Sequence, residues 1–524
     1  MKKIISVILS LIMTAAFIAG AGGSAAAFSG DTNGDGNIDN KDVVVLFRYV
    51  SGNKSGAVAE NCDYNKDNEI NNKDVVALFR ALSTGEVLVP QELVICSPGE
   101  KRSEFKIVYD KKAENPLTDE ALMLSNMIRN YSGTEVRTAG TVSVYDKEII
   151  LSSAERPETA EMLSGLKEGE YAVRVIPGKK DGDGKLLIAT TTYGSAYACA
   201  EYLTETYYSR EKGFCVPFDL DIKGTEKSYK LIESGITNKV RDPAMLVEDG
   251  VYYVYGTGWK CFKNKSGKLD GTWKKTDITV QLSHPETDGG SHWAPEVHKY
   301  NGSYYMFTTY LNSVTNHRGC IICKADSPEG PFVEITDGFI TPSGWDAIDG
   351  TFYVDPDGQP WMVFVHEWTS MPDGVGAFAA AKLSDDLTHF ISEPIELFKA
   401  NEPNWARANV TDGCFMYTTK DGELLMLWSN FDAFGYTVAV ARSSNGRLDG
   451  EWSHESNLLY SKYRTNGYDG GHAMIFTALD GQMYLCFHSP NTATDERKEM
   501  PVFVAIEEKD GKLVWTENNT DGKE

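Results

Sequence analysis

Three carboxylates and one imidazole stand at matching places in the C-terminal half of the chain. Asp242, Asp349, Asp412 and His472 each lie eight to ten residues before a turn glycine, near the start of an apolar stretch. One ionised carboxylate can activate water, and a second carboxyl group can protonate a leaving oxygen. A further negative charge beside the proton donor raises its pKa and keeps its proton available near neutral pH. The spacing therefore predicts an acid–base site, if the fold brings these residues together.

The turn glycines belong to a repeat of five hairpins. Each repeat has an Asp-Gly or Asn-Gly pair followed by an aromatic-rich apolar strand, and the glycines follow one another at intervals of 52 to 64 residues: Gly250, Gly302, Gly358, Gly422 and Gly481. Such pairs favour two-residue hairpin turns, because both central residues need positive φ. All-strand repeats of this length indicate propeller blades. We therefore predict an all-β five-bladed propeller over residues 230–515, with the strand starts at one mouth of its channel.

Residues 235–510 resemble glycoside hydrolase family 43. The resemblance rests on the segments "RDPAM", "HWAPEV", "AIDGTFY" and "GGHAMIF". It implies that Asp242 is the general base and that Asp349 orients the acid and tunes its pKa. It also implies that His472 binds substrate or a ligand on the axis, either a calcium ion or a cluster of water.

One position departs from the family pattern. The family usually has a Glu-Gly-Pro-like motif in the fourth blade, whereas this chain has "VTDGCFMY". Asp412 therefore replaces the usual acid with a side chain one methylene shorter. Glu367 in "FVHEW" and Glu296 in "APEV" are alternative proton donors, and loss of activity is a further alternative.

The segments "PWMVFVHEW" and "LLMLWSNF" are similar to family members that include arabinofuranosidases. The resemblance implies an inverting enzyme that removes α-L-arabinofuranosyl units, or alternatively β-xylosyl units, from plant polysaccharides. A non-catalytic carbohydrate-binding propeller and a scaffold protein without turnover remain rival interpretations. Several aromatic, histidine and arginine side chains could contact substrate or belong to the core: Trp293, Trp345, Trp368, Trp405, His292, His366, His488 and Arg407.

An acidic loop occurs twice near the N-terminus, from Asp31 and from Asp63, and each copy runs into a similar apolar helix. Calcium takes six to eight oxygens, which a 12-residue loop supplies from positions 1, 3, 5, 7, 9 and 12. The predicted ligands are Asp31, Asn33, Asp35, Asn37, Asp39 and Asp42 in the first loop, and Asp63, Asn65, Asp67, Glu69, Asn71 and Asp74 in the second.

Residues 28–85 resemble a type I dockerin. The first loop follows the N-terminal apolar segment almost directly and position 12 is Asp, both unlike an ordinary EF-hand. The resemblance implies an all-α domain that is folded by two calcium ions and binds a cohesin domain of a scaffoldin. A calcium sensor or buffer is the alternative.

The remaining segments complete a multidomain, secreted chain. Residues 1–27 carry two lysines, an apolar run and small residues, which is typical of a secretory signal. We therefore expect an extracellular, cellulosome-associated protein without a membrane span in the mature chain. Residues 91–227 mix predicted strands and helices and resemble the small α/β or α+β accessory domain before the barrel of some hexosaminidases and α-glucuronidases. We expect a structural spacer there, with a binding module as the alternative.

The net charge of −24 excludes nucleic acid as an expected partner, because phosphate binding needs clustered basic residues.

Chelation tests the calcium prediction. Because the loop oxygens repel one another without a cation, EDTA should unfold residues 31–83 and abolish cohesin binding. Circular dichroism and cohesin affinity measure the two effects, and the dockerin interpretation is wrong if both are unchanged in chelator.

Overall fold

The computed structural model describes residues 30–35, 37–65, 69–84, 92–113, 117–140, 145, 147–152, 157–177 and 184–517. The chain divides into two compact units, Met1–Glu92 and Leu93–Glu524. The predicted signal peptide and Asp67 lie outside the described residues. Among the helices of the described residues, none is both long and apolar enough to cross a membrane.

Two helices dominate the first unit. They are α2 (Asn40–Val50) and α3 (Asn72–Thr84), with the short η1 (Ala59–Asn61) between them. Asp39 caps α2 by accepting a hydrogen bond from the backbone N–H of Lys41 at 2.6 Å. The two helices pack together through a small core of Leu46, Cys62 and Leu78.

A six-stranded sheet forms the middle domain of the second unit, in the order β3-β2-β4-β6-β5-β9. Helices α4 and α6 share a core with Ile149, whereas α5 packs with Ile150 on the other face. Successive strand residues point to opposite faces, so one apolar run serves both layers. A small sheet, β1-β8-β7, completes this domain.

The elements of the middle domain are β1 (Glu92–Cys96), β2 (Arg102–Tyr109), α4 (Thr118–Ser132), β3 (Glu135–Gly140), β4 (Glu148–Leu151), α5 (Pro157–Ser164), β5 (Glu170–Pro177), β6 (Gly184–Thr190), α6 (Tyr193–Tyr207), β7 (Tyr208–Ser209), β8 (Gly213–Pro217) and β9 (Asp221–Thr225).

Five sheets follow along the chain. The first contains β11 (Ala244–Glu248), β12 (Val251–Gly256), β13 (Lys260–Asn264) and β14 (Lys274–Thr276). The second contains β15 (Val280–Gln281), β16 (Trp293–Tyr300), β17 (Ser303–Leu311), β18 (Arg318–Ala325) and β19 (Phe332–Glu334), with η2 (Pro285–Thr287). The third contains β20 (Ala347–Val354), β21 (Pro360–His366), β22 (Ala377–Lys382) and β23 (Ile395–Lys399).

The fourth sheet contains β24 (Asp412–Thr418), β25 (Leu424–Phe431), β26 (Tyr436–Ser443) and β27 (Trp452–His454). The fifth contains β10 (Leu231–Glu233), β28 (Gly471–Thr477), β29 (Met483–Ser489), β30 (Met500–Lys509) and β31 (Lys512–Trp515), and α7 (Lys462–Thr465) precedes it.

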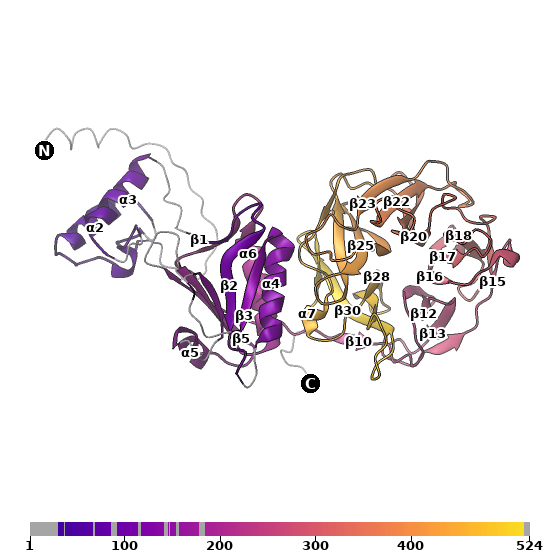
Figure 1. The fold of residues 1–524 in the computed structure, drawn as a ribbon, viewed down its shortest axis with the longest axis horizontal. Coiled ribbons are helices and arrows are strands. Elements are labelled where there is room, and N and C mark those ends of the chain that lie inside the picture. Colours follow the sequence, from indigo (N-terminus) through magenta and orange to yellow (C-terminus); the bar gives the residue numbers. More distant parts are fainter. Residues whose placement is uncertain are drawn as a thin grey trace. The chain divides into compact units, whose positions relative to one another are not determined.

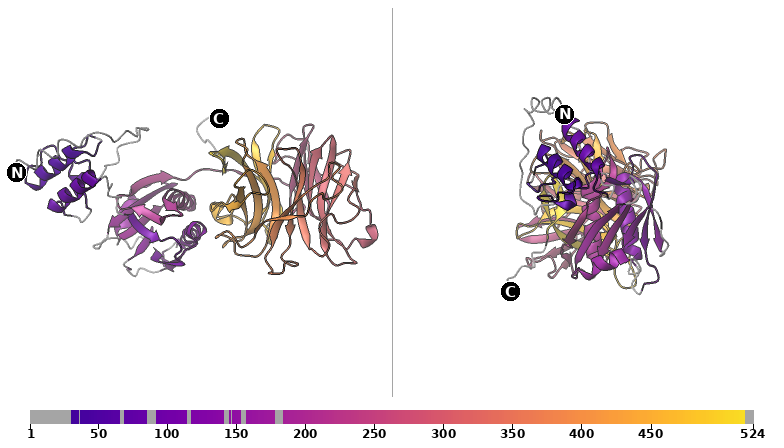
Figure 2. Two further views of the ribbon diagram at one scale, coloured as in Figure 1. Left: turned by 90° about the horizontal axis from the view of Figure 1, so that it is seen from above. Right: turned by 90° about the vertical axis from the view of Figure 1, so that its left-hand side faces the viewer.

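The five sheets form a closed ring (Figure 1). The first strands, β11, β16, β20, β24 and β28, lie innermost, and each contacts the first strands of its two neighbours. Strand β10, from the start of the domain, pairs antiparallel with β30 near its end. The predicted turn glycines all have positive φ and lie between the first and second strands of their sheets. In the left view of Figure 2, most strands of the ring run up and down the picture.

A buried arginine joins the middle domain to the ring. The guanidinium of Arg464, in α7, lies 4.3 Å from the ring centroid of Trp515 and 5.6 Å from those of Tyr197 and Tyr229. Its Nη2 atom lies 3.8 Å from Oε1 of Glu201 in α6. Only 7% of the Arg464 side chain is exposed, so these contacts are largely shielded from water.

The replacement Arg464→Met should destabilise the second unit. It removes the cation from three aromatic rings and from Glu201, which should lower the free energy of unfolding by roughly 3 kcal/mol. Thermal or urea unfolding measures this. The control is Arg447→Met, which breaks an exposed ion pair with Asp357 and should cost less than about 1 kcal/mol. Equal losses in the two variants would contradict the joining role of Arg464.

Candidate active site

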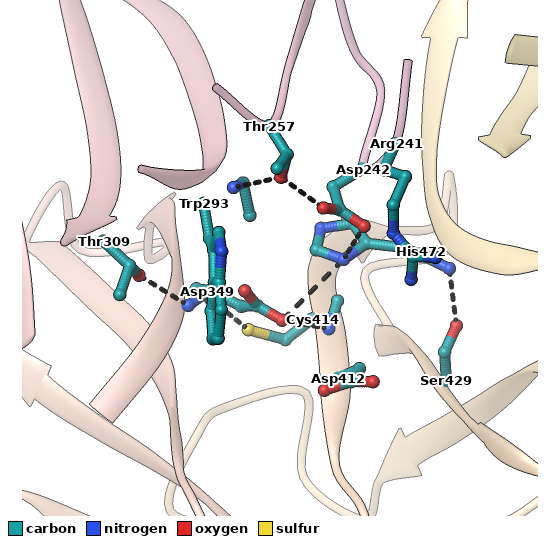
Figure 3. Close-up of polar contacts among 12 residues, drawn as sticks. Arg241, Asp242, Thr257, Trp293, Thr309, Asp349, Asp412, Cys414, Ser429 and His472 are labelled. Atoms are coloured by element: carbon teal, nitrogen blue, oxygen red, sulfur yellow. Dashed lines mark hydrogen bonds and ion pairs between the residues drawn. The ribbon is translucent and has the colours of Figure 1, made fainter. Parts of the chain in front are cut away.

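The inner strands share one backbone feature where each begins. One residue there has a positive φ: Asp242 (53°), Ala294 (41°), Asp349 (54°), Gly413 (58°) and His472 (54°). In the second to fifth sheets a shift of the pairing register occurs at this point, as in a β-bulge. A bulge re-aims a side chain out of the alternating pattern. Figure 3 shows the side chains of Asp242, Asp349 and His472 pointing toward one another.

Asp412 does not occupy the equivalent position in the fourth sheet, because Gly413 does. A Cβ atom on Gly413 would lie only 2.8 Å from Cα of His472, so this sheet has no room for a side chain there. Asp412 instead matches Trp293 of the second sheet, one residue earlier. The register predicted from the turn spacing is therefore wrong by one residue for Asp412. Its carboxyl group nevertheless lies beside the others in Figure 3.

His472 lies between two of the carboxylates. Its Nδ1 atom is 3.4 Å from Oδ1 of Asp242 and 3.7 Å from Oδ2 of Asp349. The His472 backbone N–H donates to Oγ of Ser429 at 2.8 Å, which fixes the strand start that carries the ring. The imidazole therefore lies within reach of two carboxyl groups from different sheets.

The surroundings of Asp242 favour its ionised form. Burial alone would raise its pKa, but His472 and Arg241 are among the charges that outweigh burial and hold the pKa below its usual value. The hydroxyl of Thr257 also donates a hydrogen bond to Oδ2 of Asp242. An ionised carboxylate held in this way can accept a proton from water.

His488 supports Asp242 mainly as a neutral ring. Burial lowers the pKa of His488 to about 4, so the imidazole is uncharged at neutral pH. The backbone N–H of Asp242 donates to Nδ1 of His488 at 3.3 Å, which places the ring proton on Nε2. Its side chain is fully buried.

Asp349 and Asp412 are shifted in the opposite direction to Asp242. Burial, opposed by His472, raises the pKa of Asp349, and the charge of Asp242 adds to the rise. Burial and the charges of Asp349 and Asp242 raise the pKa of Asp412 well above its usual value. The backbone N–H of Gly413 donates to Oδ2 of Asp349 at 3.0 Å, and the hydroxyl of Tyr436 donates to Oδ2 of Asp412 at 3.1 Å. Burial and the neighbouring negative charges therefore favour the protonated form of Asp412.

Glu367, the alternative acid, lies in a different environment. Nε and Nη2 of Arg318 each lie 2.7 Å from its Oε2, and only 4% of the residue is exposed. The same guanidinium lies 5.4 Å from the ring centroid of Trp293. Glu367 thus fixes an arginine beside an aromatic ring of the site, which is a positioning arrangement.

The other residues predicted to contact substrate, Glu296, His366 and Arg407, each have different neighbours. Glu296 accepts from the hydroxyl of Thr351 at 2.9 Å and pairs with His298. His366 stacks on Trp345 with ring centroids 3.7 Å apart. Arg407 donates to the backbone carbonyl of Ala406 at 3.1 Å, and no described contact joins it to the carboxylate cluster.

Trp405, a further sugar-stacking candidate, is only 1% exposed. It lies 4.8 Å from Trp428 in the core and is not part of the cluster.

Sequence reasoning missed three residues of the site. Thr257 follows the second strand of its sheet, Arg318 begins β18, and Tyr436 begins β26. The repeat directs attention to the first strand of each sheet, so it carries no signal for side chains that arrive from later strands.

The two acidic loops of the first unit have matching internal hydrogen bonds. Oδ1 of Asp42 accepts from the backbone N–H of Asn33 at 3.1 Å, and Oδ1 of Asp74 accepts from that of Asn65 at 3.0 Å. Asp42 and Asp74 are fully buried. The side-chain atoms that these loops could offer to a metal ion are oxygens, which calcium prefers as ligands. No cluster of three or more His, Cys, Asp or Glu side chains in the described part of the chain is arranged to hold a metal ion. Calcium in the loops and an ion near His472 both stay predictions.

Comparison with known proteins decides the family. Residues 235–509, just over half of the chain, match glycosyl hydrolases family 43. The chain belongs to this family. Residues 29–83 match the type I dockerin domain. Both matches confirm the resemblances predicted from the motifs.

Individual relatives of this family 43 protein include enzymes named for arabinose-containing substrates. It is 28% identical over 170 residues to the extracellular exo-alpha-(1->5)-L-arabinofuranosidase ArbA of Cellvibrio japonicus, covering 28% of this chain and 45% of that protein. It is 26% identical over 155 residues to the extracellular endo-alpha-(1->5)-L-arabinanase 1 of Bacillus subtilis, covering 26% and 46%. The chain thus spans less than half the length of either relative.

Among solved structures, the endo-arabinase of Bacteroides thetaiotaomicron is 36% identical. The match covers 55% of this chain and all of that chain, with a TM-score of 0.48.

The replacement Asp349→Asn tests the electrostatic link to Asp412. Removing one negative charge should lower the pKa of Asp412, so the high-pH limb of kcat should move to lower pH by about one unit. The measurement is kcat against pH on a chromogenic glycoside that the protein cleaves. The exposed Asp357→Asn variant is the control and should leave the limb in place. An unmoved limb in Asp349→Asn would mean that Asp412 does not donate the proton.

Proposed function

We propose that this family 43 protein is an inverting glycoside hydrolase that removes α-L-arabinofuranosyl units from plant cell-wall polysaccharides. The observation that carries the proposal is the opposite shift of two carboxyl groups in one cluster. The pKa of Asp242 is lowered, whereas the pKa of Asp412 is raised. Two titratable groups whose pKa values are pushed apart are suited to act as base and acid.

In the proposed reaction, ionised Asp242 takes a proton from a water molecule as the water oxygen attacks the anomeric carbon. Asp412 gives its proton to the glycosidic oxygen as the bond from that oxygen to the anomeric carbon breaks. The configuration of the sugar inverts, and proton exchange with solvent restores both carboxyl groups. Asp349 acts by keeping the pKa of Asp412 high, and His472 and Thr257 hold Asp242 in place.

The short acid is held by a tyrosine. Because the Tyr436 hydroxyl donates to Oδ2 of Asp412, Oδ1 is left to carry the proton to the substrate. We propose that Trp293 offers a face for the sugar, with Arg318 and Glu367 fixing its surroundings. Glu367 would then position the site, and Asp412 would be the acid.

The names of the two curated relatives support arabinose as the sugar. β-Xylosyl units remain the alternative substrate. The ring of five sheets supports the predicted five-bladed propeller, and we propose that the middle domain is its structural partner.

We also propose that the first unit tethers the enzyme to a cohesin outside the cell. Val44, Phe47, Val76 and Phe79 occupy equivalent positions on α2 and α3 and are 45 to 56% exposed. A contiguous exposed apolar surface of this kind marks an interaction site. The two acidic loops, each supplying oxygen ligands, would hold one calcium ion each.

Sugar release by the full chain tests the catalytic proposal. Wild type should release arabinose from aryl α-L-arabinofuranoside and from arabinan, with inverted configuration by NMR. Asp242→Ala and Asp412→Asn should each lower kcat on the order of 10²- to 10⁴-fold. Asp357→Asn is the matched control and should keep full activity.

If xylose is released from an aryl β-xyloside and no arabinose is released from the arabinose-containing substrates, the substrate is β-xylosyl and not α-L-arabinofuranosyl units. If no sugar is released from a full panel of glycosides while polysaccharide binding is retained, the protein is a carbohydrate-binding protein and not an enzyme.

A further inference from the structure

A cavity of about 590 Å³ lies between the middle domain and the fourth sheet of the ring. Tyr131 and Tyr208 line it from the middle domain, and Trp405, Trp452 and His454 line it from the ring. Its volume is within the range of small-molecule sites in proteins. The carboxylates of the cluster are not among its lining residues, so the cavity is separate from the catalytic cluster.

The two parts of the chain approach closely at this cavity. Gly133 ends α4 with a φ of 74°, and a Cβ atom built on it would lie 3.2 Å from Oδ1 of Asn404 in the ring. Asn457 donates to Oε1 of Glu201 and of Glu205, in α6, at 3.0 Å each. Together with the Arg464 contacts, these hydrogen bonds hold the cavity walls in one arrangement.

Two lining side chains have buried polar atoms without a partner. Nε1 of Trp405 and Nδ1 of His454 accept or donate no hydrogen bond among the described residues. Trp405 is 1% exposed, and 10% of the His454 side chain is exposed. Buried polar groups in folded proteins are nearly always paired, so unpaired ones need an explanation. A hydroxyl-bearing ligand would supply both an acceptor and a donor.

The aromatic walls suit a ligand with apolar faces. The rings of Tyr131 and Tyr208 meet edge to face with centroids 5.7 Å apart, and both residues are half-buried. Trp452 is also half-buried, and its Nε1 donates to the backbone carbonyl of Leu448 at 3.3 Å. Each ring thus keeps part of its surface available. Flat apolar faces combined with hydrogen-bonding groups match a sugar ring, which has C–H faces and a rim of hydroxyls.

The charge of the lining narrows the ligand class. Glu402, Glu451 and Glu455 line the cavity, against one cation, Arg210. Glu455 already pairs with Arg442 at 2.9 Å. The negative excess repels uronates and phosphates, which leaves neutral saccharides as the favoured class.

We infer that this cavity is a second carbohydrate site, which binds a neutral segment of the polysaccharide apart from the catalytic cluster. The choice of arabinan and arabinoxylan as probes rests on the proposed function. The readout is binding and not hydrolysis, so failure of this site and failure of the catalytic proposal are distinguishable.

Affinity gel electrophoresis of the full chain, in the non-hydrolysing Asp242→Ala background, tests the inference. Linear arabinan or arabinoxylan should slow migration, and polygalacturonate should not. Trp452→Ala should weaken binding about tenfold or more. The matched control is Trp361→Ala, another half-buried tryptophan whose Nε1 is hydrogen-bonded, to Asp355. Equal binding by both variants, or a preference for polygalacturonate, would overturn the inference.

A second measurement does not depend on the folding of Trp452→Ala. The parent protein, labelled with ¹⁵N-tryptophan, has ten indole groups, and Trp405→Phe assigns the Trp405 signal. Neutral arabino- or xylo-oligosaccharides should shift that signal on titration. An unmoved Trp405 signal at saturating oligosaccharide would overturn the site. In the active enzyme, Trp452→Ala should leave kcat/KM on an aryl glycoside unchanged.

Discussion

Ionised carboxyl groups buried at the centre of one ring repel one another. They cannot all be charged unless cations or hydrogen-bond donors compensate them. An isolated buried carboxylate is costly, so each needs a cation, a hydrogen-bond donor or a proton. Asp242 has His472 and Arg241 close by and is ionised. Asp412 instead has a tyrosine hydroxyl and the negative neighbours Asp349, Asp242 and Glu367, so its protonated form is favoured. The proposed division into base and acid follows from which side of the cluster carries the positive charge.

The backbone makes this division possible. A positive φ at the start of each inner strand brings one residue per sheet toward the centre, although such a conformation is unfavourable for side chains other than Gly, Asn and Asp. Gly413 takes that place in the fourth sheet, since any Cβ would meet His472. The carboxyl group that the fourth sheet contributes to the cluster therefore comes from the preceding residue, Asp412. The fourth sheet thus differs from its neighbours at the residue that lies against His472.

The hairpin repeat was sufficient to predict where the inner strands begin and that Asp242, Asp349 and His472 lie together. Asp-Gly and Asn-Gly turns are local signals, and they survive into the fold unchanged. The one-residue error at Asp412 has a physical cause: the position equivalent to Asp349 and His472 is Gly413, where a Cβ atom would meet His472, so the carboxylate lies one residue earlier. Tyr436 and Arg318 could not be found in this way, since their contacts join strands that are distant in sequence. The mixed order of the middle sheet and the pairing of β10 with β30 likewise depend on tertiary packing.

The pairing of Leu231 with Val504 has a consequence for how the chain is made. The strand that completes the last sheet leaves the ribosome first among the elements of the ring, and its partner leaves near the end. The last sheet of the ring therefore cannot be completed until the final strands emerge. Contacts of such long sequence separation slow folding. Unpaired strand edges also invite association with other chains. Export of this protein before its last strand is translated would keep the last sheet incomplete during transit.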